Sequence, residues 1–230
     1  MISPVLASRR SIGPGLATSA PSAAAASWWL DGGVDPASAV AVYQPIGAAS
    51  LAASYTNLAN PGTYNAAPGV APTWASGTGW GFAGVQYLTT GIVAASGWSA
   101  VVRVSNCTQS YASAFGDRTL STARFYIQPN TPNAGGSAIF AYGNLESNGK
   151  AGSNVNGVLA VTPNAGYVNG VQNVTFSATW SGSGGGIFIG TRNGSAPAPL
   201  NGNIQAIAIY STTLTAPQVA AISAAMAALT

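Results

Sequence analysis

The stretch that decides the fold of this chain runs from Ala165 to Val219 and reads AGYVNGVQNVTFSATWSGSGGGIFIGTRNGSAPAPLNGNIQAIAIYSTTLTAPQV. It begins with an apolar run that is interrupted by Asn169-Gly170. An Asn-Gly pair supplies the two positive φ angles that a type I′ turn requires, so we expect a tight hairpin there. A short β-rich run at residues 187–189 ends at Gly190 and is followed by a proline-broken loop. The stretch therefore predicts a succession of short strands.

The last apolar run of this stretch, residues 203–210, has an unusual pattern. One face is apolar throughout, and the other becomes apolar only in its second half. This pattern is typical of a strand that passes between two layers. Strict alternation assigns Ile204, Ala206, Ala208 and Tyr210 to the same face.

The order of these runs resembles the C-terminal half of the laminin-G-like, concanavalin A-like jelly-roll domains, which close with a strand ending in Ile-Tyr and a short helix. Weaker similarities lie at residues 82–88 and 97–104. The resemblance implies an all-β fold, an antiparallel jelly-roll β-sandwich. It leaves the function open, because this sandwich is shared by lectins, glycanases, adhesion modules and structural proteins.

The rest of the chain fits one such domain over residues 27–230, with regular turn signals between short apolar runs. Residues 39–43 form a plausible strand, and residues 44–80 are an irregular insertion that we expect to be packed by its own aromatic side chains. A capping box at residues 215–218 predicts a helix over residues 215–229, lying on the sandwich edge. The remaining strands are expected near residues 81–89, 98–105, 111–116, 123–129, 137–142, 155–161, 165–169, 172–180, 186–190 and 203–210.

Residues 1–26 are rich in Ala, Ser, Gly and Pro and have no hydrophobic period. Prolines break the segment and it lacks a long apolar run, so we interpret it as an uncleaved N-terminal arm rather than a signal peptide. Such a segment cannot offset its own ordering entropy. We expect it to be held in an assembly or strapped across its own sandwich.

Four residues near this arm are candidate assembly contacts. Arg9 and Arg10 form the one pair of adjacent basic residues, and Trp28 and Trp29 open the globular part. Two adjacent tryptophans in a strand point to opposite faces. One of them is therefore expected in the core and the other against the arm or a partner.

Charge is scarce along the whole chain. Charged residues make up 5% of the 230 residues, against roughly 25% in typical soluble domains. A surface so poor in charge is weakly protected against self-association. It suits either a protein covered by copies of itself and other subunits, or a neutral extracellular domain with a Ser/Thr/Asn surface. The seven basic residues are scattered, which argues against nucleic-acid binding, and no stretch approaches the roughly 18 apolar residues of a membrane span.

The composition also excludes several kinds of chemistry. The chain has no histidine, which removes serine-histidine triads and histidine metal sites. The single cysteine, Cys107, excludes an intrachain disulfide and a cysteine metal site. The four acids lack the pattern of a two-carboxylate glycanase, so we expect no enzyme. They also leave room only for a weak calcium site, and no other cofactor is expected.

Sugar binding needs an aromatic platform with amide or hydroxyl partners, and neither requires charge. The alternative is that the tryptophans are core or interface anchors and that the Asp-Arg pair is a solvated turn. The candidate glycan-binding residues are Trp74, Trp80, Tyr111, Asp117, Arg118 and Asn144.

Two functional hypotheses follow. The first is a non-enzymatic structural protein of a large particle, such as a capsid decoration or tail-associated protein of a bacteriophage virion. It would contact copies of itself and other virion proteins and display the jelly roll for adhesion to host-surface glycans. The alternative is a secreted or cell-surface lectin-like domain that binds carbohydrate.

Overall fold

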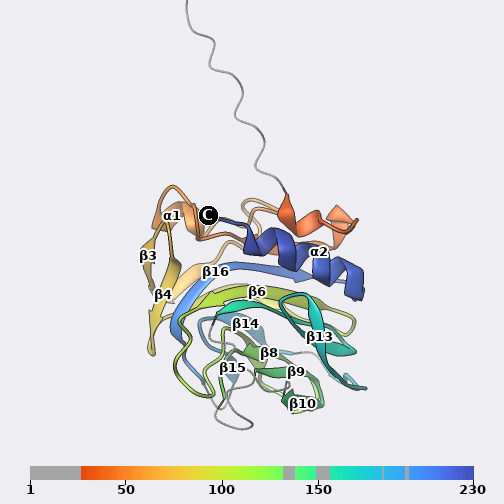
Figure 1. The fold of residues 1–230 in the computed structure, drawn as a ribbon. Coiled ribbons are helices and arrows are strands. Elements are labelled where there is room, and N and C mark those ends of the chain that lie inside the picture. Colours follow the sequence, from red (N-terminus) through yellow and green to blue (C-terminus); the bar gives the residue numbers. More distant parts are fainter. Residues whose placement is uncertain (1–26, 132–137, 149–155, 183, 195–196) are drawn as a thin grey trace, which may run out of the picture.

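The computed structural model describes residues 27–131, 138–148, 156–182, 184–194 and 197–230. Within these ranges two eight-stranded sheets are stacked as a sandwich (Figure 1). All strand pairs are antiparallel except one short parallel pair. This confirms the predicted all-β sandwich with a short C-terminal helix. The predicted arm, with Arg9 and Arg10, lies outside the described residues.

The first sheet carries the outer helical layer, and the second sheet carries the candidate site. The first sheet runs in the order β13 (Val171–Thr175), β12 (Ala165–Val168), β11 (Gly157–Val161), β6 (Ser99–Ser105), β16 (Asn201–Tyr210), β4 (Gly79–Ala83) and β3 (Thr73–Ala75), with β1 (Ala39–Tyr43) also paired to β16. The second runs β10 (Leu145–Asn148), β9 (Ile139–Gly143), β8 (Arg124–Gln128), β7 (Phe115–Arg118), β14 (Gly186–Ile189), β5 (Tyr87–Val93) and β2 (Ala67–Val70), with β15 (Asn193–Gly194) paired to β7.

The main core lies between the two sheets. Alternate residues of the second sheet, including Phe115, Phe125 and Phe140, face it and are fully buried. Because side chains alternate across a strand, the residues between them point to the outer face of this sheet. That alternation places the polar and aromatic side chains of the site.

Strand β16 separates two apolar layers, as its sequence pattern predicts. Ile207 and Ile209 lie in the core between the sheets, whereas Ala208 and Tyr210 pack under the helical layer. A bulge between Ile204 and Ala206 shifts the register against β6. Ile204 therefore joins the inter-sheet core, and its predicted assignment to the face of Tyr210 is wrong.

The hairpin at Asn169-Gly170 has the predicted turn. Asn169 has φ 49° and Gly170 has φ 78°, the two left-handed residues of a type I′ connection. Val168 and Val171 pair directly across it. The Asn169 side chain also accepts a hydrogen bond from the backbone of Val158 at 2.9 Å, which ties the hairpin to β11.

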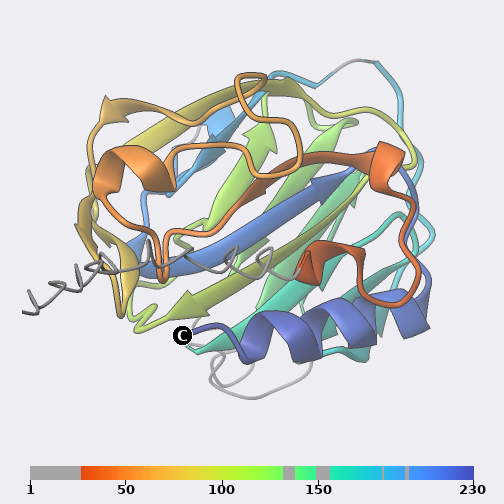
Figure 2. The same ribbon diagram turned by 90° about the horizontal axis from the view of Figure 1, so that it is seen from above.

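Helix α2 (Ala216–Ala227) begins at the predicted capping box, with Thr215 and Gln218 bonded reciprocally. It covers the outer face of the first sheet rather than its edge, and Figure 2 shows it beside the N-terminal segments above the strands. Val219, Ile222 and Met226 are its buried apolar residues. The predicted edge position is therefore corrected, because this face of the sheet is itself apolar and needs a cover.

The two tryptophans at the start of the domain lie in a 3₁₀ helix, η1 (Trp28–Leu30), and not in a strand. Their rings meet edge to face at 5.7 Å. Both pack into the apolar layer under α2, and Trp28 donates its Nε1–H to Gln44 Oε1 at 2.8 Å. Trp28 is buried, as predicted for one of the two rings, and Trp29 is partly buried in the same layer. The predicted contact of the second ring with the arm lies outside the described residues.

The predicted irregular insertion contains short elements. They are helix α1 (Leu51–Ser54) and strands β2 and β3, and the second 3₁₀ helix, η2 (Pro36–Ser38), precedes them. Buried Asn57 organises the segment, because its side-chain amide bonds the backbone of Val40, Val42 and Thr63 at 2.9 to 3.0 Å. The single strand predicted at residues 81–89 is two strands, β4 and β5.

Candidate ligand-binding site

The two tryptophans predicted as a sugar platform lie in the body of the domain. Trp80 is fully buried, packs against Tyr43 and Tyr55, and donates its Nε1–H to Ser54 Oγ at 2.7 Å. Trp74 is partly buried and donates to the Pro45 carbonyl at 2.8 Å. Trp80 is closed to any ligand, and this corrects its predicted role as a platform.

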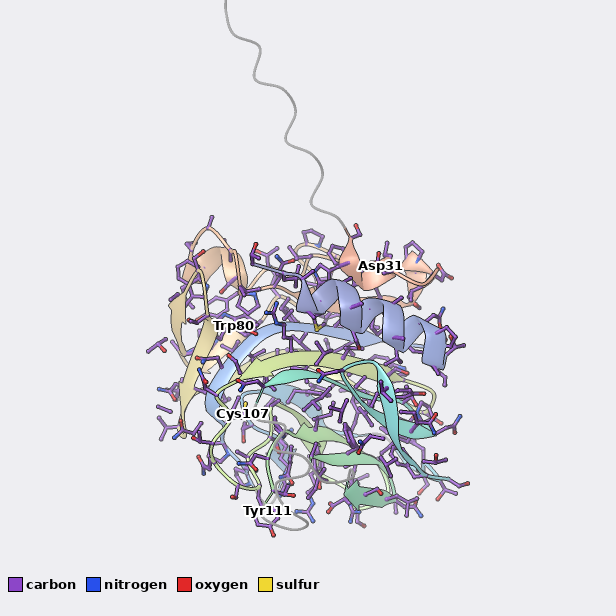
Figure 3. All side chains as sticks on the ribbon, in the orientation of Figure 1. Asp31, Trp80, Cys107 and Tyr111 are labelled. Atoms are coloured by element: carbon purple, nitrogen blue, oxygen red, sulfur yellow. The ribbon has the colours of Figure 1, made fainter. Side chains whose placement is uncertain are left out.

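Tyr111 and Asp117 are not brought together with the tryptophans. Tyr111 is exposed and lies at the opposite end of the sandwich from the helical layer, well away from Trp80 (Figure 3). Asp117 is fully buried in β7, where its carboxylate accepts hydrogen bonds from Thr119 N, Thr119 Oγ1 and Gly185 N at 3.0, 3.1 and 2.7 Å. The predicted solvated turn at Asp117 is therefore wrong, because these donors hold the carboxylate in the interior.

Arg118 and Asn144 do belong to one site, around Glu146. The Nε atoms of Arg118 and Arg124 both lie 3.3 Å from Glu146 Oε1. Arg124 also donates from Nη1 to the Asn144 carbonyl at 3.2 Å. The Asn144 side chain accepts from Thr179 N at 2.9 Å, so this residue positions the backbone beside the ion pairs.

A third arginine completes the group. The guanidinium carbon of Arg192 lies 4.8 Å from the ring centroid of buried Tyr126. Burial lowers the pKa of Arg192, and the neighbouring charges of Arg118 and Arg124 lower it further, against the opposing effects of Tyr126 and Glu146. We call Arg118, Arg124 and Arg192 around Glu146 the guanidinium cluster.

Tyr126 connects the members of this cluster. Its pKa is raised first by burial and then by a hydrogen bond with Glu146 and the charge of that carboxylate. The positive charges of Arg192 and Arg118 act in the opposite direction. The phenol is therefore held in its neutral, hydrogen-bonding form beside the carboxylate.

The register of the second sheet explains this convergence. Gly116 pairs with Tyr126, Tyr126 pairs with Ala141, and Ala141 pairs with Glu146. Opposite residues of neighbouring strands share a face, so these four lie in one row on the outer face. A Cβ at Gly116 would overlap the Tyr126 side chain, so glycine is required there.

The same row leads to a pocket. Phe188 of β14 is the next residue along it, paired with Gly116. Its ring stacks on that of Tyr87 at 5.4 Å between centroids and 13° between planes. These two rings form part of the wall of a cavity of about 420 Å³, which is also lined by Arg192, Asn193 and Pro197. We call this cavity the aromatic pocket.

Of the guanidinium cluster only Arg118 is among the residues predicted from the sequence, and no residue of the aromatic pocket is. A local signal did exist for two residues: Ile187 and Ile189 point inward, which turns Phe188 outward, and the same argument applies to Tyr126. No local signal places Arg192, because it lies in the loop after β14.

The described residues contain no group of three or more His, Cys, Asp and Glu side chains that is placed to hold a metal ion. No helix in the described ranges has the length and apolar character of one that crosses a membrane. The site as described is therefore a hollow with aromatic, amide and guanidinium groups. That chemistry suits non-covalent binding of a polar ligand.

Comparisons with known proteins report on the fold. No protein-family model matches the chain, and no curated protein matches it in sequence. Among solved structures, it is similar to domain 4 of AbnA, an extracellular GH43 arabinanase from Geobacillus stearothermophilus, solved in complex with arabinotriose. The TM-score is 0.56 at 18% identity, and the match covers 81% of this chain and 98% of that domain.

The chain is also similar to part of a Trypanosoma rangeli sialidase, solved with 2,3-difluorosialic acid. The TM-score is 0.53 at 12% identity, covering 81% of this chain but 32% of the sialidase. At these identities both likenesses show the sandwich fold alone. The all-β sandwich that the laminin-G-like resemblance implies is therefore confirmed.

Proposed function

We propose that this chain is a non-catalytic carbohydrate-binding domain and that the aromatic pocket is its sugar site. The observation that carries the proposal is the pocket itself. Its volume of about 420 Å³ lies within the range of roughly 300 to 1,000 Å³ that is usual for small-molecule sites. The stacked rings of Tyr87 and Phe188 offer an apolar surface to the C–H face of a sugar, and Asn193 and Arg192 offer polar partners.

The structural comparison supports the same class of ligand. Domain 4 of the arabinanase, which is matched over almost its whole length, was solved with an oligosaccharide bound. A shared sandwich does not transfer a ligand by itself. The support therefore comes from the combination of that fold with a pocket that contains aromatic and amide side chains.

The environments of the four acids support a non-catalytic role. Asp117 is buried and bonded to Thr119 and Gly185, and Glu146 is paired with two arginines. Asp31 follows η1 and Asp35 precedes η2, so both flank the 3₁₀ helices of the outer layer. A glycosidase needs two carboxylates about 5 to 9 Å apart across one sugar, and no aromatic-pocket residue is an acid.

The more specific hypothesis, that the chain is displayed on a bacteriophage virion and associates with copies of itself, is based on the low charge content of the sequence and on the N-terminal arm. Its structural candidates Arg9 and Arg10 lie outside the described residues, and Trp28 and Trp29 pack within the domain. The carbohydrate-binding alternative has the better structural support. A secreted or surface-displayed location is part of the same proposal.

The test is isothermal titration calorimetry with a panel of neutral and acidic oligosaccharides. We expect at least one to bind the wild-type protein and Phe188→Ala to weaken that binding about tenfold, the effect of removing one aromatic contact. Tyr64→Ala is the matched control, because Tyr64 is an exposed aromatic residue that does not line the pocket. Equal losses in the two variants, or no binding of any oligosaccharide, would contradict the proposal.

A further inference from the structure

We infer that the ligand of this site is an acidic sugar, with its ring in the aromatic pocket and its carboxylate or sulfate group on the guanidinium cluster. This inference rests on the proposed function and adds the chemical class of the ligand. It is carried by the local charge, by the partial burial and the remaining donors of the arginines, and by the position of Arg192.

The local charge is strongly unbalanced for this chain. Two of its seven basic residues, Arg118 and Arg124, pair with the single carboxylate of Glu146, and a third, Arg192, is close enough to all three to interact with their charges, in a protein with 5% charged residues. Asp117 does not balance this charge, because it lies two positions after Phe115 in β7 and so points to the same inner face of the sheet. Its carboxylate accepts hydrogen bonds from Thr119 and Gly185 rather than from the arginines. The cluster therefore keeps an excess of two positive charges.

Three positive charges that lie close together in a partly buried place repel one another. The residue Arg192 is about nine-tenths buried, and the side chains of Arg118 and Arg124 are 32% and 18% exposed. One carboxylate cannot neutralise three guanidinium groups. A bound anion would reduce this excess of positive charge.

The arginines also keep donors for a ligand. Arg118 and Arg124 reach Glu146 through Nε, which leaves the terminal nitrogens of their planar groups for other acceptors. Within the described residues, one of these nitrogens, Arg124 Nη1, donates a hydrogen bond to the Asn144 carbonyl, and the terminal nitrogens of Arg118 donate none. Guanidinium groups bind carboxylate and sulfate-like anions through such paired donors.

Arg192 connects the cluster to the aromatic pocket. It lines the cavity beside Phe188, and its guanidinium lies over Tyr126, the residue that is bonded to Glu146. A sugar ring against Tyr87 and Phe188 therefore has Arg192 beside it. An acidic group on that sugar would lie next to the positive charge of Arg192, whereas a neutral sugar would gain nothing from this charge.

The experiment compares uncharged, carboxylated and sulfated ligands on four proteins. The ligands are arabinotriose, oligogalacturonate and a heparin oligosaccharide, titrated at 50 and 500 mM NaCl. The proteins are wild type, Arg118→Gln, Glu146→Gln and Asp35→Asn. The last two make the same charge change, but Asp35 caps η2 in the outer layer, away from the site.

We expect one acidic oligosaccharide to bind the wild type more tightly than arabinotriose, and we expect its affinity to fall at 500 mM NaCl. Arg118→Gln should weaken this binding about tenfold, because a charge-assisted hydrogen bond is lost. Glu146→Gln should strengthen it severalfold, because a competing anion is removed, and Asp35→Asn should leave it unchanged. Preference for oligogalacturonate assigns the site to carboxylates, and preference for heparin assigns it to sulfates.

Two other results are distinguishable. Binding of arabinotriose that depends on Phe188 but not on Arg118, with no preference for acids, would overturn this inference and leave the proposed function standing. No binding of any of the three ligands, nor of the wider oligosaccharide panel, would overturn both.

Discussion

Asp117 and Glu146 are acids of the same sheet in opposite environments. Asp117 lies in the interior, where its carboxylate accepts hydrogen bonds from Thr119, just after β7, and from Gly185, just before β14, and so joins these two segments. Glu146 lies on the outer face with 29% of its side chain exposed and is shared by two arginines. The first acid therefore stabilises the fold, and the second sets the charge of the candidate site.

The buried thiol of Cys107 should be unreactive in the native protein. Cys107 is 1% exposed, its thiol donates to the Ser105 carbonyl at 3.7 Å, and burial raises its pKa from 9.0 to about 12. The thiolate is the reactive form, so the native protein should resist Ellman's reagent at pH 8. The same protein in denaturant should react fully within minutes. Rapid reaction of the native protein would show that Cys107 is accessible.

The raised pKa of Cys107 also makes the stability of the protein depend on pH. A raised folded-state pKa means that the folded protein holds the proton more tightly, so the stabilising contribution is complete below pH 9 and is lost as the pH rises toward 12. The free energy of unfolding should therefore fall between pH 9 and 11. Part of this fall should disappear in Cys107→Ala, and the rest should come from buried tyrosines such as Tyr43 and Tyr210, whose pKa values are also raised by burial.

At the scale of elements, helix α2 is fastened at both ends. Its N-terminus is closed by Thr215 and Gln218. At its C-terminus, Arg103 of β6 donates from Nη1 to the carbonyls of Met226 and Leu229 at 2.9 and 2.8 Å. A cation at this end also interacts favourably with the helix dipole. The helix is thereby fixed over the apolar face of the first sheet.

The N-terminal cap can be tested by itself. Thr215→Ala should lower the free energy of unfolding by about 1 kcal/mol, because the hydrogen bond that the Thr215 hydroxyl accepts from the backbone N–H of Gln218 is lost. Thr215→Ser should keep most of the stability. Thr212→Ala is the control, since Thr212 is exposed and lies outside the capping box. Urea denaturation measures all three, and equal stability of Thr215→Ala and wild type would contradict the assignment.

These elements show what local sequence can predict. Asn169-Gly170 and Thr215–Gln218 determine their own backbone through short-range hydrogen bonds, so the turn and the cap were predictable. The bulge before Ala206 was not, because it depends on how β16 pairs with β6. Likewise, the buried environment of Asp117 depends on Gly185, which lies far along the chain.

At the scale of the whole molecule, the chain forms a helical layer over two sheets, and the candidate site lies on the face that the helix does not cover. Tyr87, Phe188 and Glu146 come from three strands that are far apart in the chain, β5, β14 and β10. Only the order of strands in the second sheet brings them into one region. The site therefore could not be predicted from spacing, although the sandwich could be predicted from regular strands and turns.

The central claim is that the aromatic pocket is where sugar binds, and amide chemical-shift mapping tests it most directly. The wild-type protein would be titrated with the oligosaccharide that binds most tightly in calorimetry. We predict that the largest shifts occur at residues 84–87, at Phe188 and at residues 191–194. Shifts concentrated around Trp74, or in the layer of α2, would contradict the account.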